Sequence, residues 1–236
     1  MSRGLRRAAW IAGGGVGATV LLGLGYVATT WHRYGRVATN GEDHSLLHQF
    51  MPTFDVIDRH RVAVAAPAAI TYESARAMDL KRSPLVRAIF NGRELVMRAE
   101  PVETAPPQPL VDECLSLGWG VLAEEPGREI VLGAVTRPWE ANVTFRALPP
   151  SEFTAFDEPG YVKIAWNLRV EPNGPDRSIF HTETRAATTD AYAARRFRRY
   201  WTMFSPGIKL IRLESIRMVR RDAQRRGKVT GVTRVE

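Results

Sequence analysis

The sequence contains very little cysteine and none of the common short motifs of catalysis. Cys114 is the single cysteine in 236 residues, so one chain can form neither an internal disulfide nor a cysteine-rich zinc site. It contains no P-loop, G-x-S-x-G, H-E-x-x-H or C-x-x-C pattern. Hydrophobic residues make up 44% and charged residues 25% of the chain. This ordinary globular composition excludes the disordered, collagen-like and disulfide-scaffold classes.

Positive charge is concentrated at the two ends of the chain, and the formal net charge is +8. Residues 1–36 carry five arginines and no acidic group, and residues 190–228 carry 12 basic and 3 acidic groups. The body between them, residues 37–189, carries 15 basic and 21 acidic groups. The high isoelectric point therefore describes two basic segments and not a uniformly basic domain.

Residues 8–31 contain no charged side chain. A helix of this length measures roughly 36 Å, enough to cross a hydrocarbon core of about 30 Å. Trp10 lies near one end of the segment, and Tyr26 and Trp31 lie near the other, where aromatic side chains prefer the membrane interfaces. We therefore predict an uncleaved N-terminal transmembrane helix, with a cleaved signal peptide as the alternative.

The arginines on either side of this segment bear on its orientation. Arg3, Arg6 and Arg7 precede it, whereas Arg33 and Arg36 follow it. The positive-inside rule favours a cytoplasmic N-terminus and a soluble domain on the opposite side. The predicted localisation is a single-pass membrane protein, and the small charge difference leaves the side of the soluble domain open.

The predicted organisation has four parts. An anchor region covers residues 1–36, a juxtamembrane linker 37–57, one folded domain 58–226 and a C-terminal tail 227–236. Two clusters near the start of the domain could in principle bind a metal: His44 with His48, and Asp55 with Asp58 and His60. They are interpreted as a solvated helix and a polar lead-in to a strand, so we predict no metal site and no cofactor.

Hydrophobic periodicity divides the domain into strands and helices. Alternation predicts strands over 59–65, 115–121, 130–134, 142–148, 161–170 and 178–187. Spacings of three and four predict helices over 68–80 and 191–226, and Ser83-Pro84 and Pro150 should open two more. Pro206 should kink or break the last helix.

Three stretches in this element order carry a resemblance to a known family. They are residues 161–170 (YVKIAWNLRV), 182–185 (TETR) and 195–201 (RRFRRYW). They resemble uncharacterised bacterial members of the START-like, Bet v 1-like helix-grip superfamily, which includes polyketide cyclase/dehydrase-like proteins. The resemblance implies an α+β fold: a curved antiparallel sheet wrapped around a long C-terminal helix, here preceded by one transmembrane helix. It carries no shared catalytic set, so the catalytic residues stay unknown.

The resemblance also implies an apolar cavity between sheet and helix. Its candidate ligand-binding residues are large apolar side chains, with two threonines supplying polar contacts: Trp119, Trp139, Trp166, Phe180, Thr182, Thr184, Phe197, Trp201 and Phe204. The alternative is a filled core, because aromatic residues at such spacings commonly pack against one another.

The sequence favours binding of a hydrophobic small molecule or lipid in this cavity. A cyclase/dehydratase-type enzyme and an interaction module with a filled core are the alternatives, and enzymatic activity is left open. The acid–base groups available for catalysis are Asp112, Glu113, His181, Glu183 and Arg185. Strand alternation places the last three on the face opposite Phe180.

The expected partners are the membrane and a hydrophobic ligand. Anionic headgroups could also bind the arginines of residues 190–228. No nucleic-acid partner is expected, because the aromatic side chains among these arginines share one helix face, which indicates burial.

Overall fold

The computed structural model describes residue 29, residues 45–100 and residues 108–232. Apart from Thr29, the predicted transmembrane helix and its flanking arginines lie outside the described residues. Among the described residues, no helix combines the length and the apolar character that a bilayer crossing requires.

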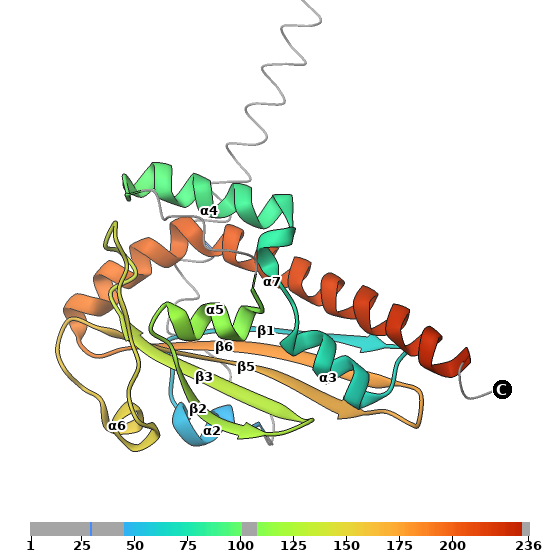
Figure 1. Ribbon diagram of the computed structural model, residues 1–236. Coiled ribbons are helices and arrows are strands. Elements are labelled where there is room, and N and C mark those ends of the chain that lie inside the picture. Colours follow the sequence, from blue (N-terminus) through green and yellow to red (C-terminus); the bar gives the residue numbers. More distant parts are fainter. Residues whose placement is uncertain (1–28, 30–44, 101–107, 233–236) are drawn as a thin grey trace, which may run out of the picture.

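A single antiparallel sheet organises the fold, and a long helix lies across it (Figure 1). The strands follow the order β1-β6-β5-β3-β2, with β4 paired to β3. They are β1 (Val56–Val64), β2 (Gly120–Glu125), β3 (Glu129–Thr136), β4 (Phe145–Arg146), β5 (Val162–Pro172) and β6 (Ser178–Thr188). The helices are α2 (Leu47–Phe50), α3 (Ala68–Arg76), the 3-10 turn η1 (Leu80–Arg82), α4 (Pro84–Met97), α5 (Leu110–Ser116), α6 (Pro150–Ala155) and α7 (Ala191–Val232). This is the α+β helix-grip arrangement that the sequence predicts.

Helices cover both faces of the sheet. The inner face carries α3, α5 and α7, and the outer face carries α2 and α6 (Figure 1). Strand β3 is buried along its whole length, because it lies inside the sheet between β2 and β5 and both of its faces are covered. The outer layer begins with Leu47 and Met51, which are buried against the sheet, within the segment that the sequence assigns to a linker.

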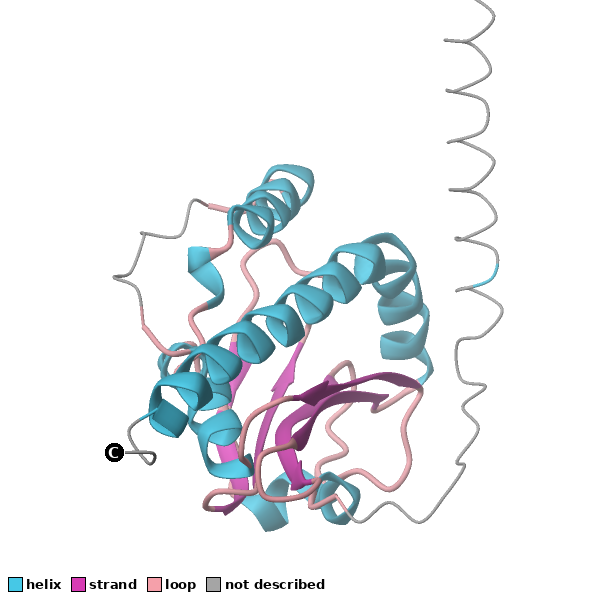
Figure 2. Ribbon diagram, turned by 90° about the vertical axis from the view of Figure 1, so that its right-hand side faces the viewer, coloured by secondary structure: helices cyan, strands magenta, loops and turns pink. Residues whose placement is uncertain are grey.

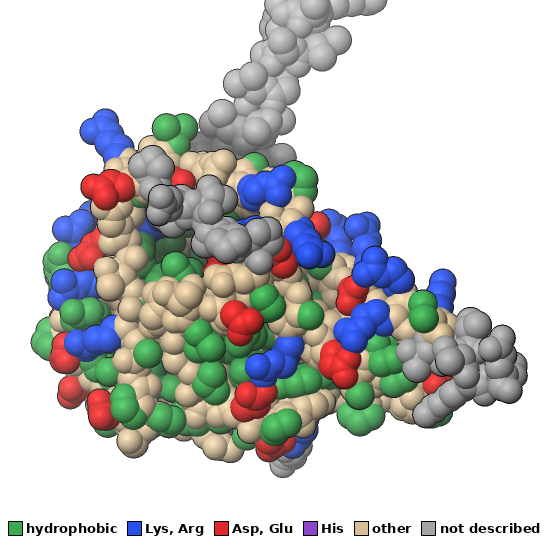
Figure 3. Space-filling view, viewed as in Figure 1, with side chains coloured by type: hydrophobic (Ala, Val, Ile, Leu, Met, Phe, Trp, Pro, Cys, Tyr) green, Lys and Arg blue, Asp and Glu red, His purple; other side chains and the backbone are tan. Residues whose placement is uncertain are grey.

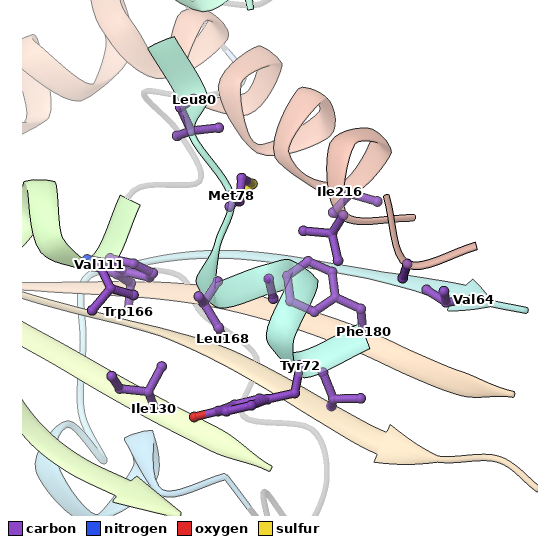
Figure 4. Close-up of a cluster of buried hydrophobic side chains, with 14 of the residues drawn as sticks. Val64, Tyr72, Met78, Leu80, Val111, Ile130, Trp166, Leu168, Phe180 and Ile216 are labelled. Carbon is purple, nitrogen blue, oxygen red and sulfur yellow. The ribbon is translucent and has the colours of Figure 1, made fainter. Parts of the chain in front are cut away.

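Two apolar clusters lie on the inner face of the sheet. The first lies beneath α3, α5 and the second half of α7, and includes Trp166, Leu168, Phe180 and Ile216 (Figure 4). The second lies beneath the first half of α7 and consists of Val56, Val162, Ala186, Phe197 and Trp201. The inner layer therefore has two apolar centres along one helix.

Helix α7 is continuous over residues 191–232 although Pro206 lies inside it. It extends six residues beyond the predicted end at 226. Figure 2 shows that α7 changes direction within its first half. Pro206 provides the physical cause, because it cannot donate a backbone hydrogen bond to the preceding turn. The predicted kink is therefore present, and the helix resumes after it.

The predicted strand over 115–121 is wrong. Residues Leu110–Ser116 form helix α5, and β2 begins only at Gly120. Asp112 and Glu113 lie in the first helical turn, where negative charge stabilises the helix dipole. The alternating leucines that suggested a strand are the exposed end of this helix. Gly118, with φ of 97°, then turns the chain into β2.

Gly118→Ala is expected to lower the free energy of unfolding by about 1–3 kcal/mol, the usual cost of a strained backbone conformation. A Cβ there would also clash with the backbone oxygen of Phe145. Gly127→Ala is the matched control, because Gly127 has φ of 80° but open space around the added Cβ. Urea unfolding of both variants measures the difference, and equal losses would mean that the contact with Phe145 contributes nothing.

Candidate functional site

A band of polar side chains crosses the inner face of the sheet beneath α7. Asp58 on β1 pairs with Thr184 on β6, which pairs with Trp166 on β5. His60 follows two positions along β1 and pairs with Thr182. Because residues two positions apart point to the same face of a strand, these side chains all project toward α7.

Arg212 of α7 reaches into this band from above. Its guanidinium donates to Thr182 Oγ1 at 3.1 Å and also to Thr184 Oγ1. The guanidinium carbon lies 5.4 Å from the centre of the Trp166 ring, within cation–π range. Burial lowers the pKa of Arg212, and the charge of Asp58 acts in the opposite direction. An arginine nevertheless keeps its proton in proteins, so the band contains a fixed positive charge.

Asp58 is the second charged group of the band and is only 6% exposed. Its Oδ1 lies 3.1 Å from His60 Nε2. Its other carboxylate oxygen, Oδ2, is buried and has no hydrogen-bond partner among the described residues. Leaving a buried acceptor unsatisfied costs about 1–3 kcal/mol, and more when the group is charged. Oδ2 therefore marks a position where a donor from outside the protein chain would be stabilised.

The structure divides the predicted ligand-binding residues between the two inner clusters. Trp166 and Phe180 belong to the first cluster, with Trp119 packed at its edge, 6.3 Å from Trp166 between ring centres. Thr182 and Thr184 lie in the polar band. The remaining residues gather at the first half of α7: Phe197 and Trp201 in the second cluster, Trp139 packed against it, and Phe204 on Tyr200. The polar band separates the two groups.

Sequence reasoning missed Arg212 and did not assign Asp58 and His60 to a binding site. The periodicity contained the signal. Asp58 and His60 alternate in phase with the inward-facing Val62 of β1. Arg212 lies four residues after Ile208 and four before Ile216, on the helix stripe that packs against the sheet. A polar residue in phase with an apolar stripe faces the interior.

The acid–base candidates on β6 lie on the outer face, as strand alternation predicts. Glu183 pairs there with Arg59 and with Arg185, whose Nε lies 2.6 Å from Glu183 Oε1. His181 Nε2 lies 3.0 Å from a carboxylate oxygen of Glu171. Of the other two candidates, Asp112 and Glu113 in α5, Glu113 pairs with Lys81 at 3.0 Å. Each paired group thus has a structural partner away from the polar band.

Cys114 lies close enough to Arg212 for its charge to act on the thiol, but it is not an activated nucleophile. Burial raises the pKa of Cys114 to about 12, and Arg212 opposes this only in part. Because the thiolate is the reactive species, native Cys114 is expected to alkylate about a thousandfold more slowly than an ordinary cysteine. Mass spectrometry of the chain labelled in native buffer and in denaturant measures this ratio, and rapid native labelling would contradict it.

No family model and no curated protein matches the sequence. Solved structures share the arrangement only distantly. A conserved protein from Geobacillus kaustophilus is 11% identical, with a TM-score of 0.35, and the match covers 72% of this chain and 96% of that one. Norcoclaurine synthase from Thalictrum flavum is 12% identical, with a TM-score of 0.29, over 75% and 97% of the two chains. A START superfamily protein from Mycobacterium smegmatis is 12% identical, with a TM-score of 0.23, over 74% and 98%.

Proposed function

We propose that this protein binds an amphipathic small molecule between the sheet and α7. The observation that carries the proposal is the buried Oδ2 of Asp58, which has no hydrogen-bond partner in the described part of the chain and lies near enough to Arg212 for their charges to interact. A ligand group that donates to Asp58 and accepts from Arg212, such as a hydroxyl or a hydroxy acid, would satisfy both. The apolar clusters on either side of the band suit the hydrophobic body of such a ligand.

The N-terminal segment adds a location to this proposal. The uncharged residues 8–31 would hold the binding domain at a membrane, where lipids and isoprenoid-like molecules are concentrated. A lipid-like ligand carrying a hydroxyl or carboxyl group therefore fits both the interior and the proposed location.

Native mass spectrometry tests the proposal. The described core residues and the side chains packed against them lie between Leu46 and Ala223, so a chain of residues 37–236 retains all of them. We expect an added mass that organic extraction identifies as one amphipathic class. A well-folded but empty domain that takes up no apolar fluorescent probe would contradict binding and favour an interaction module with a filled core.

The Asp58–His60 pair favours a second function, proton transfer in the same site. A histidine hydrogen-bonded to a carboxylate is a common general acid–base arrangement, and the Arg212 charge would stabilise an oxyanion formed beside it. The reaction would then be of the cyclase or dehydratase type. The extracted ligand, incubated with fresh protein, decides between the two functions. Conversion that His60→Gln abolishes while the ligand still binds indicates an enzyme, and recovery of unchanged ligand indicates a binding protein.

A further inference from the structure

The solvent-facing side of α7 carries a ridge of apolar side chains. Met203, Leu210 and Leu213 are 55%, 44% and 41% exposed, and Pro206 between them is exposed as well. Steps of three, four and three residues place these four side chains in one line along the helix. We call Met203, Pro206, Leu210 and Leu213 the α7 ridge.

The packing of α7 leaves this ridge uncovered. The neighbouring helix α4 approaches α7 along another line, where Ile89 lies close to Gly207 and Ser83 Oγ donates to Glu214 at 3.3 Å. The sheet covers the opposite side of α7, where Ser205, Ser215 and other residues are buried. The ridge lies beside the line that contacts α4, and its four side chains stay exposed.

Basic residues extend the ridge in both directions. Between residues 191 and 221 every exposed charged side chain of α7 is basic: Arg195, Arg196, Arg199, Lys209, Arg217, Arg220 and Arg221. Figure 3 shows blue side chains gathered along the right-hand half of this helix. An apolar centre flanked by arginines is the pattern of helices that lie in a membrane interface.

We propose that the α7 ridge docks on the surface of an anionic lipid bilayer. The apolar side chains would enter the boundary between headgroups and acyl chains, and the arginines at both ends would contact lipid phosphates. Charge complementarity supports this occupant, because the exposed charged side chains of α7 between residues 191 and 221 are all basic. A nucleic acid fits less well, because the ridge offers no aromatic side chain on which bases could stack.

Docking would place the helix that covers the inner face of the sheet directly on the membrane. The proposal does not depend on the interior ligand, because every residue of the ridge lies on the outside of α7. If both proposals hold, a ligand leaving the interior would meet the bilayer beside α7.

Spin labels on the full chain test the docking. Met203→Cys and Leu210→Cys each add one reactive thiol, because burial raises the pKa of Cys114 to about 12 and suppresses its labelling. The labelled chain is reconstituted into vesicles of phosphatidylcholine alone and of phosphatidylcholine with phosphatidylglycerol. With the anionic lipid we expect both labels to become accessible to oxygen and protected from a water-soluble nickel complex. A label at Leu95→Cys, on an 81% exposed residue of α4, should stay in water.

Charge variants supply the second arm of the test. Arg199→Gln with Arg220→Gln should reduce the equilibrium constant for insertion by about fivefold for each arginine removed. Arg128→Gln with Arg177→Gln removes the same charge from the β2–β3 and β5–β6 turns and should leave insertion unchanged. Ridge labels that stay in water, that insert equally into neutral vesicles, or that are protected only by added duplex DNA would each overturn the proposal. Insertion at Leu95 instead would move the docking surface to α4.

Discussion

Replacing Glu183 with alanine is expected to lower the free energy of unfolding by about 3–5 kcal/mol, as removing one partner of a buried ion pair does. Glu183 binds Arg185 and Arg59 on the outer face of the sheet. Arg185 is fully buried and also donates to the backbone oxygen of Met51 at 2.7 Å. Without Glu183, the buried guanidinium of Arg185 loses the carboxylate that its Nε binds. Urea unfolding followed by circular dichroism measures the loss.

A surface pair provides the control for this prediction. Glu125 and Arg128 are 43% and 48% exposed and lie 2.5 Å apart in the turn between β2 and β3. Glu125→Ala removes a carboxylate from a well-formed pair but should cost no more than about 1 kcal/mol. The double variant Glu183→Leu with Arg185→Met removes both buried charges and should recover part of the loss. Equal losses in Glu183→Ala and Glu125→Ala would contradict the structural role of the buried pair.

The same polar network explains how residues 45–54 are held against the sheet. Ser45 Oγ donates to the buried carboxylate of Glu129 at 2.5 Å, and Asn167 Nδ2 donates to the same oxygen at 2.7 Å. Arg185 lies over the Phe54 ring and binds Met51. Residues 45–54 are therefore fixed to the outer face by charged and polar contacts and also by the burial of Leu47.

Local patterns predicted the regular elements because each carries its own physical signal. Ser83 Oγ accepts from the backbone N–H of Val86 and caps α4, as the Ser-Pro pair indicates. Strands β5 and β6 begin and end within two residues of the predicted strands over 161–170 and 178–187. The stripe at spacings of three and four that predicts the last helix is the face of α7 that packs on the sheet.

The polar band could not be recognised with the same ease, because its residues come from three distant segments. Asp58, Thr184 and Arg212 meet only when β1 pairs with β6 and α7 crosses both strands. Each of them alone is a single polar residue on an otherwise apolar face, which does not by itself indicate a binding site. Strand pairing and the crossing of α7 over the sheet belong to the tertiary structure, whereas periodicity in the sequence indicates only which face of its own element each residue occupies. The nine residues predicted for the ligand therefore included the two threonines but neither charged group.

Arg212→Met is expected to reduce the amount of ligand that co-purifies with residues 37–236 by about ten- to a hundredfold. Hydrogen bonds to a charged group contribute about 1.5–3 kcal/mol, and methionine keeps much of the side-chain length without donors. Asp58→Asn tests the other end of the band, because it preserves shape but removes the charge on the unpaired oxygen. Native mass spectrometry gives the ligand occupancy of each variant.

Arg226→Gln separates loss of the site from a general effect of removing an arginine from α7. Arg226 lies on the same helix and pairs with Glu73 at 2.5 Å near the surface, so the Arg226→Gln variant should keep full ligand occupancy.

Thermal unfolding of each ligand-free variant identifies any that fail to fold. Thr184→Val then tests the band without removing a charge. If Arg212→Met and Asp58→Asn fold and retain the ligand, the molecule binds elsewhere. Neither Asp58 nor Arg212 would then contact the ligand. Asp58 Oδ2 would have only a structural role, with water as its hydrogen-bond donor.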